Sequence, residues 1–128
     1  MRLAVFTGDD AWRRKADALF DAILPTAAEN LYSHLSLLNG LDLRLRAAEL
    51  VVVGREVTRF ADAALRLPFI DRMVLRARRE EDLPPAHPAR GSLANLPETA
   101  VLVCVGERCS LPVTQPDAIA EAVTRMRG

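Results

Sequence analysis

The two cysteines, Cys104 and Cys109, are the residues of this 128-residue chain best suited to chemistry. A chain reversal at Gly106 would bring their sulfurs within bonding range, which requires Cα atoms about 4.4 to 6.8 Å apart. Their spacing differs from the C-x-x-C of redox active sites, and the sequence has no second cysteine pair to complete a zinc site. Arg108 would lower the pKa of a neighbouring thiol. Two interpretations stay open: a structural pair, with Cys104 buried and Cys109 partly exposed, or a redox or metal-responsive pair.

A bond between these cysteines would close a short loop. It would therefore stabilise the fold by less than the ~3 kcal/mol of a fifteen-residue loop. We expect the pair near the carboxyl edge of a sheet, where sites of α/β proteins usually form. This position favours a reversible switch over a structural staple, so alanine at Cys109 should leave the fold intact.

The remaining candidate residues carry weaker signals. His34 falls among leucines of a predicted helix and is interpreted as a core-edge histidine, and His87 lies in a proline-rich loop without a cysteine or second histidine nearby. The turn at 53–56 could hold a phosphate, but its single glycine, Gly54, matches neither the dinucleotide nor the P-loop pattern. The sequence offers no Ser-His-Asp or paired-carboxylate arrangement. We therefore expect no catalytic residue, no cofactor and no metal ligand.

Composition excludes several classes of protein. Apolar residues make up 50% and charged residues 27%, with 17 basic and 17 acidic side chains, which argues against disorder and against nucleic acid as a partner. The longest apolar runs are far short of the ~20 residues of a membrane span, and no secretory signal is expected. With only two cysteines, a reducing cytoplasmic location is the default. Sixteen arginines against one lysine suggest a GC-rich bacterial genome.

The N-terminal third reads as two helices. Apolar residues at helical spacing predict a helix over 9–24, stopped by Pro25. A capping box at 26–29 opens a second helix over 27–46, so that 9–46 forms an antiparallel helical hairpin. The apolar stripe of this hairpin must be covered by the sheet or by another subunit, since leaving it wet costs ~25 cal/mol per Å². This requirement predicts a homodimer, and the stripe comprises Trp12, Leu19, Phe20, Leu31, Leu35 and Leu38.

From residue 48 the pattern changes to short apolar runs. Strands are predicted at 49–54, 71–77 and 99–105, because each run is apolar without alternation. Helices are predicted at 57–66 and 115–127, the latter opened by a capping box at 114–117. An irregular crossover containing Pro84, Pro85, Pro88 and Pro97 separates the last two strands. We therefore predict an α/β fold with two domains: the hairpin at 1–47 and, at 48–128, a small three-stranded parallel sheet with flanking helices.

Four segments together resemble the C-terminal end of the YyaL-type thioredoxin-domain protein family, which is related to a spermatogenesis-associated protein. The most specific is C-x4-C-S-x-P-V-T-x-P, and the order and spacing of the four cover nearly the whole chain. They are Leu3–Asp9, Leu37–Leu43, Glu49–Gly54 and Val103–Pro116.

The resemblance implies that the chain corresponds to the last helices of an alpha/alpha toroid, similar to six-hairpin glycosidases, followed by an α/β segment. The thioredoxin cysteine motif and the toroid pocket have no counterpart here, so no catalytic residue carries over. It also implies that residues 1–6 end a helix rather than form a strand. The leading hypothesis is a noncatalytic C-terminal structural or interaction module, either a separate gene product or a fragment, whose partner is the missing toroid domain or a second copy. The alternatives are a small thiol redox or metal-responsive protein using Cys104 and Cys109, and part of a carbohydrate-processing enzyme.

Overall fold

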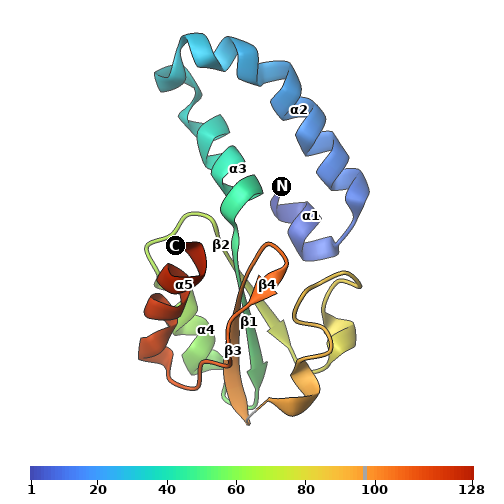
Figure 1. Ribbon diagram of the computed structural model, residues 1–128, viewed down its shortest axis with the longest axis vertical. Helices are drawn as coiled ribbons and strands as arrows, with labels where there is room; N and C mark the ends of the chain where they lie inside the picture. Colours follow the sequence, from blue (N-terminus) through green and yellow to red (C-terminus); the bar gives the residue numbers. More distant parts are fainter. Residues whose placement is uncertain (97) are drawn as a thin grey trace.

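The protein has a mixed α/β fold in which a helical arm extends from a four-stranded sheet (Figure 1). The computed structural model describes residues 1–96 and 98–128. The arm consists of α1 (Arg2–Thr7), α2 (Asp10–Glu29), η1 (Leu31–His34) and α3 (Leu35–Arg46). The strands are β1 (Ala48–Gly54), β2 (Arg72–Ala77), β3 (Thr99–Val105) and β4 (Arg108–Cys109). The α/β class predicted from the sequence is thus confirmed.

The sheet has the order β2-β1-β3-β4 and mixed strand directions. The strands β1 and β2 pair in parallel, joined by α4 (Val57–Leu65), as predicted. The prediction of a three-stranded parallel sheet is nevertheless wrong, because β3 runs antiparallel to β1 and a fourth strand pairs with β3. In the β1–β3 register Glu49 lies opposite Cys104, and Gly54 lies opposite Thr99.

The error has a physical cause. An apolar run without alternation shows that a strand is buried on both faces, and Ala100 to Cys104 are all buried, but burial does not fix strand direction. The segment after β2 folds over one face of the sheet, and β3 begins at the end of the sheet where β1 and β2 finish. Antiparallel pairing follows directly from that entry point. Pro97, one of the four prolines assigned to this crossover, lies outside the described residues.

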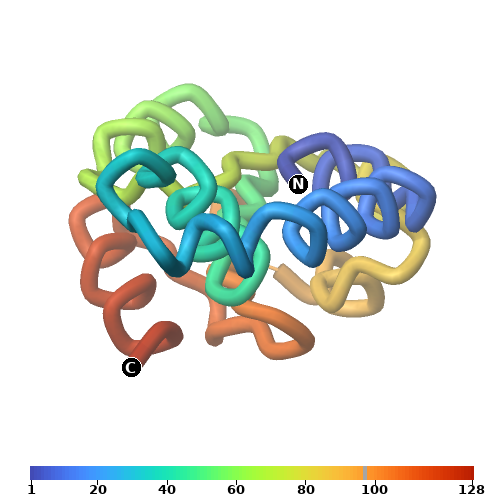
Figure 2. Tube along the Cα trace, turned by 90° about the horizontal axis from the view of Figure 1, so that it is seen from above, coloured from blue at the N-terminus to red at the C-terminus, as the bar shows by residue number. Residues whose placement is uncertain are grey.

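Each face of the sheet has its own apolar core. One face packs against α4 and α5 (Ile119–Arg127) through a cluster that includes Leu50, Val52, Val101, Val103, Phe60, Ile119 and Val123. The other face carries Val51, Val53, Leu102 and Cys104, and is covered by Leu83, Ala89 and Leu93 of the crossover. The crossover includes η2 (Glu80–Asp82) and η3 (Leu93–Asn95). Viewed from above, α5 and the crossover lie on opposite sides of the strands (Figure 2).

The helical hairpin forms, but its reversal lies five residues beyond the predicted one. Helix α2 continues through Pro25 to Glu29, so Pro25 does not stop it and the box at 26–29 opens no helix. A proline within a helix removes one backbone hydrogen bond. By contrast, Asn30 leaves helical geometry, with φ −148°, and its side chain accepts a hydrogen bond from Ser33 N. The chain therefore turns at Asn30.

Two contacts join the long helices of the hairpin. Arg44 Nε on α3 donates to Asp17 Oδ1 on α2 at 2.8 Å. A Cβ at Gly40 would lie 3.3 Å from Cζ of Phe20, so the absence of a side chain there lets the phenyl ring approach α3. The two helices run in opposite directions, as predicted (Figure 1).

The ends of the chain are helical, as expected. The stretch before Thr7 is α1 rather than a strand, which confirms the expectation carried by the resemblance. The last helix begins with η4 (Pro116–Ala118) and continues as α5. The predicted capping box at 114–117 does not form, because Gln115 is the N-cap residue and its side chain makes no capping hydrogen bond. Pro116 at the first position starts the helix instead. Within 1–96 and 98–128, no helix combines the length and apolar character needed to cross a membrane.

Candidate functional site

A disulfide joins Cys104 on β3 to Cys109 on β4. Their Cα atoms lie 4.0 Å apart, slightly closer than the expected interval. The reversal occurs at Gly106, whose φ of 60° at the first loop position suits the two-residue turns of β-hairpins. The predicted approach of the two sulfurs is therefore confirmed.

The two sulfur atoms have different surroundings. Cys104 is 1% exposed and belongs to the apolar cluster beneath the crossover, whereas Cys109 is half-buried at the rim of that cluster. Arg108 pairs with Val105, the next position along the hairpin, so alternation directs its side chain to the face opposite the disulfide. A reagent approaching from solvent therefore meets Cys109 first.

The residues after Cys109 fasten the hairpin to β3. Ser110 N donates to Val103 O at 2.8 Å, and Ser110 Oγ accepts from Val103 N at 3.1 Å. Val113 and Val101 exchange two backbone hydrogen bonds of 2.9 Å. The S-x-P-V part of the motif thus completes the edge of the sheet beside the disulfide.

His87 and Glu49 form a buried contact that the sequence did not reveal. Of the residues that the structure describes, His87 is one of two buried polar ones. Its Nε2 lies 2.9 Å from Oε2 of Glu49, in ion-pair range although not aligned as a hydrogen bond. The backbone N–H of Ala89 donates to Nδ1 of His87 at 3.1 Å. A ring nitrogen that accepts a hydrogen bond carries no proton, so the imidazole proton is assigned to Nε2, facing the carboxylate.

This pair lies in the same cross-strand row as the disulfide. Met73, Glu49, Cys104 and Cys109 are successive register partners across β2, β1, β3 and β4. Directly opposed residues share a face and have Cβ atoms about 4.5 to 5.5 Å apart. The sequence predicted the disulfide at the carboxyl end of the sheet strands, but it lies beside the amino end of β1. The prediction was wrong because β3 runs antiparallel to β1.

The turn at 53–56 has a structural explanation. A Cβ at Gly54 would lie 1.9 Å from Glu98 O, and φ there is +114°. Only glycine therefore fits at this position, where the backbone at Glu98 approaches closely. An open pocket of about 540 Å³ adjoins the turn, and Arg55 on its rim pairs with Glu98 at 3.5 Å in an exposed contact. The structure supports close chain approach rather than phosphate binding as the role of this glycine.

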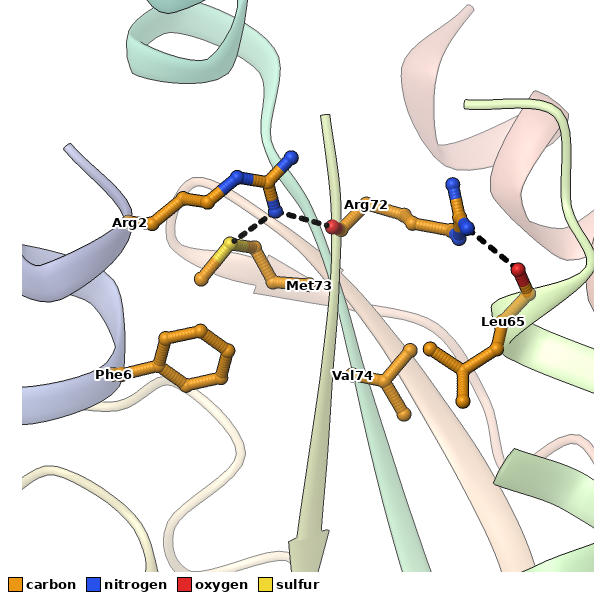
Figure 3. Close-up of a pocket in the computed structure, with 6 residues that line it drawn as sticks. All are labelled: Arg2, Phe6, Leu65, Arg72, Met73 and Val74. Atoms are coloured by element: carbon orange, nitrogen blue, oxygen red, sulfur yellow. Dashed lines mark hydrogen bonds between the residues drawn. The ribbon is translucent and has the colours of Figure 1, made fainter. Parts of the chain in front are cut away.

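A smaller pocket of about 220 Å³ lies between α1 and β2 (Figure 3). Arg2 spans it, donating to Arg72 O at 3.1 Å and to Ile70 O, with Met73 Sδ at 3.3 Å. Arg72 in turn donates to Leu65 O at 2.6 Å. Arg2 and the Nη atoms of Arg72 are hydrogen-bonded to the chain itself, whereas Arg72 Nε is buried without a hydrogen-bond partner among the described residues. The contacts of Arg2 fasten the arm to the sheet.

His34 makes a local contact and joins no site. Its Nδ1 lies 2.9 Å from Asn30 O, one helical turn earlier, and the residue is half-buried. Within the ranges that the structure describes, no group of three or more His, Cys, Asp or Glu side chains is arranged to hold a metal ion.

A separate network of charged residues joins the arm to the C-terminal helix. Arg127 of α5 donates to Asp71 Oδ1 at 3.2 Å, its Nη2 lies 2.6 Å from Asp71 Oδ2, and it reaches Asp42 of α3 at 3.5 Å. A hydrogen bond from Arg46 lowers the pKa of Asp42, and one from Arg44 lowers the pKa of Asp17. The network joins α3, α5 and the loop before β2.

The arm carries most of the large hydrophobic side chains that are exposed in the described part of the chain. Of residues 1–47, all of which are described, only Ala4, Ala27 and Leu43 count among the buried hydrophobic residues. Eight of the eleven large hydrophobic side chains found exposed in the described part of the chain belong to the arm: Leu3, Phe6, Trp12, Leu19, Leu31, Tyr32, Leu35 and Leu45. The sheet therefore does not cover the predicted stripe.

Comparisons with protein-family models, with curated proteins and with solved structures return no match to this chain. The resemblance to the YyaL-type family rests on the four sequence segments alone. The function must accordingly be argued from two features of this fold, the exposed arm and the cysteine hairpin with its neighbouring Glu49–His87 pair.

Proposed function

We propose that this chain is a noncatalytic interaction module whose helical arm binds a second protein surface. The observation that carries the proposal is the near absence of buried apolar residues in the arm. Leu19, Leu35 and Leu45 are 58%, 56% and 67% exposed. Burying a fully exposed leucine side chain contributes about 1.5 to 3 kcal/mol. Burying several half-exposed side chains of this kind would therefore stabilise an assembly by several kcal/mol.

The partner proposed first is a second copy of the chain. Two arms with the same exposed apolar surface can cover each other, as expected of a symmetric dimer. The resemblance supplies the other candidate, the toroid helices of a longer YyaL-type protein, against which the arm would pack in the same way.

Light scattering at micromolar concentration tests the homodimer. The native chain should have the mass of two copies, and Leu35→Glu should have the mass of one because a charge in the contact is costly to bury. Leu111→Glu is the matched control, since Leu111 lies outside the arm and is 87% exposed. A native chain that is monomeric without aggregating would overturn the homodimer. Equal masses for the two variants would show that the arm does not form the contact.

A second function, thiol–disulfide exchange at Cys104 and Cys109, is favoured by a different observation. The disulfide links two adjacent strands through cysteines only 5 positions apart in the sequence, so the loop that it closes is short. It therefore removes little conformational entropy from the unfolded chain. One sulfur is partly accessible and the other buried, which gives an incoming thiolate one point of attack. These features support a reversible bond more than a structural staple.

The reduction potential tests this function. The native chain is equilibrated in mixtures of reduced and oxidised dithiothreitol, and free thiols are counted after alkylation. An exchangeable bond should have a midpoint above about −300 mV, whereas structural disulfides of secreted proteins typically lie below that value. A midpoint below it would exclude the exchange function and leave the module proposal untouched.

A further inference from the structure

We propose that Glu49 exchanges a proton with the sulfur of Cys104 when the Cys104–Cys109 disulfide opens and closes, and that His87 positions Glu49 for this step. The inference rests on the exchange function proposed above. It assigns chemistry to a buried contact that neither the cysteine motif nor the module proposal uses.

The first argument is placement. Glu49 on β1 and Cys104 on β3 are direct register partners, so their side chains leave the sheet on the same face, about one strand spacing apart. Cys109 follows Cys104 in the same row. The Glu49 side chain is 18% exposed, so it can take up a proton from solvent at the rim of the cluster.

The second argument is the burial of Cys104. When an incoming thiolate attacks the accessible sulfur of Cys109, the sulfur of Cys104 leaves with the electron pair of the broken bond. Cys104 is 1% exposed among apolar side chains, where a thiolate loses its hydration and receives little in return. A proton must therefore reach this sulfur, and Glu49 is the acidic side chain directly beside it.

The third argument is the role of His87. The Ala89 N–H fixes the ring through Nδ1, which leaves Nε2 on the side of Glu49, 2.9 Å from Oε2. The His87 side chain is 2% exposed, so the ring has little freedom to turn away. With Oε2 held in this way, Oε1 is the oxygen left to take up a proton from solvent and pass it to Cys104. His87 is thus a positioning residue, and Glu49 is the proton donor and acceptor.

The complete step requires a dithiol as the reductant. Its first thiolate bonds to Sγ of Cys109, the S–S bond breaks, and Oε1 of Glu49 passes to Cys104 a proton that it takes up from solvent. The second thiolate of the dithiol then attacks the mixed disulfide, releasing Cys109, which takes a proton from water. The chain gains two electrons and two protons, the dithiol becomes a disulfide, and Glu49 ends the step as it began. Closure by an oxidised dithiol runs in reverse, with Glu49 as the base.

The test is the rate at which dithiothreitol opens the disulfide, followed by acid quenching, alkylation and mass spectrometry in the presence of EDTA. Glu49→Gln should slow opening by about tenfold or more, since a positioned acid or base contributes about 10²- to 10⁴-fold. Glu107→Gln in the hairpin turn is the matched control, because it removes the same charge near Cys109 without touching Cys104. This control should be opened as fast as the native chain or faster.

The sign of the Glu49→Gln effect separates three explanations. Removing a negative charge favours attack by an anionic thiolate, and loosened packing exposes the bond, so both would speed opening. Only loss of proton supply slows it. A Glu49→Gln chain opened as fast as the native one, or faster, would overturn the inference. Failure of the exchange function itself would look different, because the midpoint potential of the native disulfide would then lie below about −300 mV, whatever the opening rate of Glu49→Gln.

Two His87 variants test positioning independently of the Glu49 variant. His87→Asn keeps a side-chain acceptor for the Ala89 N–H but cannot reach Glu49, so opening should slow about as much as in Glu49→Gln. His87→Gln places an N–H near the former Nε2 and should restore part of the rate. If both variants open at the native rate while retaining the native circular dichroism spectrum, His87 does not position Glu49.

Discussion

The ion pair between Arg127 and Asp71 gives a sharp test of how the C-terminal helix is held. We consider Arg127→Met, which keeps the length and apolar character of the side chain and removes its charge. Asp71 is 2% exposed and the Arg127 side chain 14% exposed, so the variant leaves a buried carboxylate without its partner. The arginine also lies 5.2 Å from the centre of the Phe69 ring, a contact that methionine can partly replace.

Breaking a buried ion pair by removing one partner costs about 3 to 5 kcal/mol. For a domain of 128 residues, 3 kcal/mol corresponds to a fall in Tm of about 10 °C. Arg125→Met is the matched control in the same helical turn. Arg125 pairs with Glu121 at 2.6 Å, but both side chains are more than 70% exposed, so its loss should cost less than about 1 kcal/mol.

Thermal and urea unfolding, followed by circular dichroism, measure both variants. The double variant Asp71→Asn with Arg127→Met should recover part of the loss, because it leaves no unpaired buried charge. If Arg127→Met is no more destabilising than Arg125→Met, the inference from burial to stability is wrong for this pair.

Three further outcomes are expected. Gly54→Ala should destabilise the fold by more than about 2 kcal/mol, because the added Cβ would clash with Glu98 O. Gly106→Ala should cost only the ~1 to 2 kcal/mol of a positive φ, because no atom lies within 4 Å of the added Cβ. Equal losses of unfolding free energy in urea would contradict this expectation. Because the folded-state pKa values of Asp17 and Asp42 are lowered, their ion pairs should stabilise the fold above about pH 4, and this stabilisation should be lost as the pH falls further. A Tm that does not change with acidification would contradict these contacts. Cys109→Ala should retain the fold, and reduction of the native chain should shift Tm only slightly; a large loss in the reduced variant would show that the thiol is needed for packing.

The local part of the fold could be predicted from the sequence, because local signals determine it. Helical spacing located α4 and the last helix, and the apolar runs located β1, β2 and β3. The glycine between the cysteines identified the hairpin, since a reversal at Gly106 depends only on neighbouring residues. Strand direction was beyond these signals, because the apolar run at 99–105 looks the same from either end.

The position of the helical reversal was predicted wrongly for a related reason. Pro25 is the strongest helix breaker by type, but a single missing hydrogen bond did not end α2, whereas the side chain of Asn30 stabilised a new turn. Helix propensity ranks residues one at a time. A helix ends, however, where the next residues can also form a stable turn and satisfy the free backbone groups.

The Glu49–His87 contact could not be predicted, because its members belong to distant segments. It forms only when the crossover folds back over the sheet, and it neighbours the disulfide only because β3 is antiparallel. With β3 parallel, Cys104 would lie at the far end of β1, near Val53. The one available signal was the carboxylate itself, placed at the start of an otherwise apolar strand.

The fastening of α1 to the sheet bears on how copies of this protein can associate. An edge strand with free carbonyl groups invites pairing with a strand of another molecule. At the start of β2, Arg2 occupies the outward carbonyls of Ile70 and Arg72. At the opposite edge, β4 is two residues long and the chain then turns to bridge Val113 with Val101. Strand addition is thereby discouraged at β4 and at the start of β2, which favours contact between helical arms over fibrous growth if copies of the chain associate.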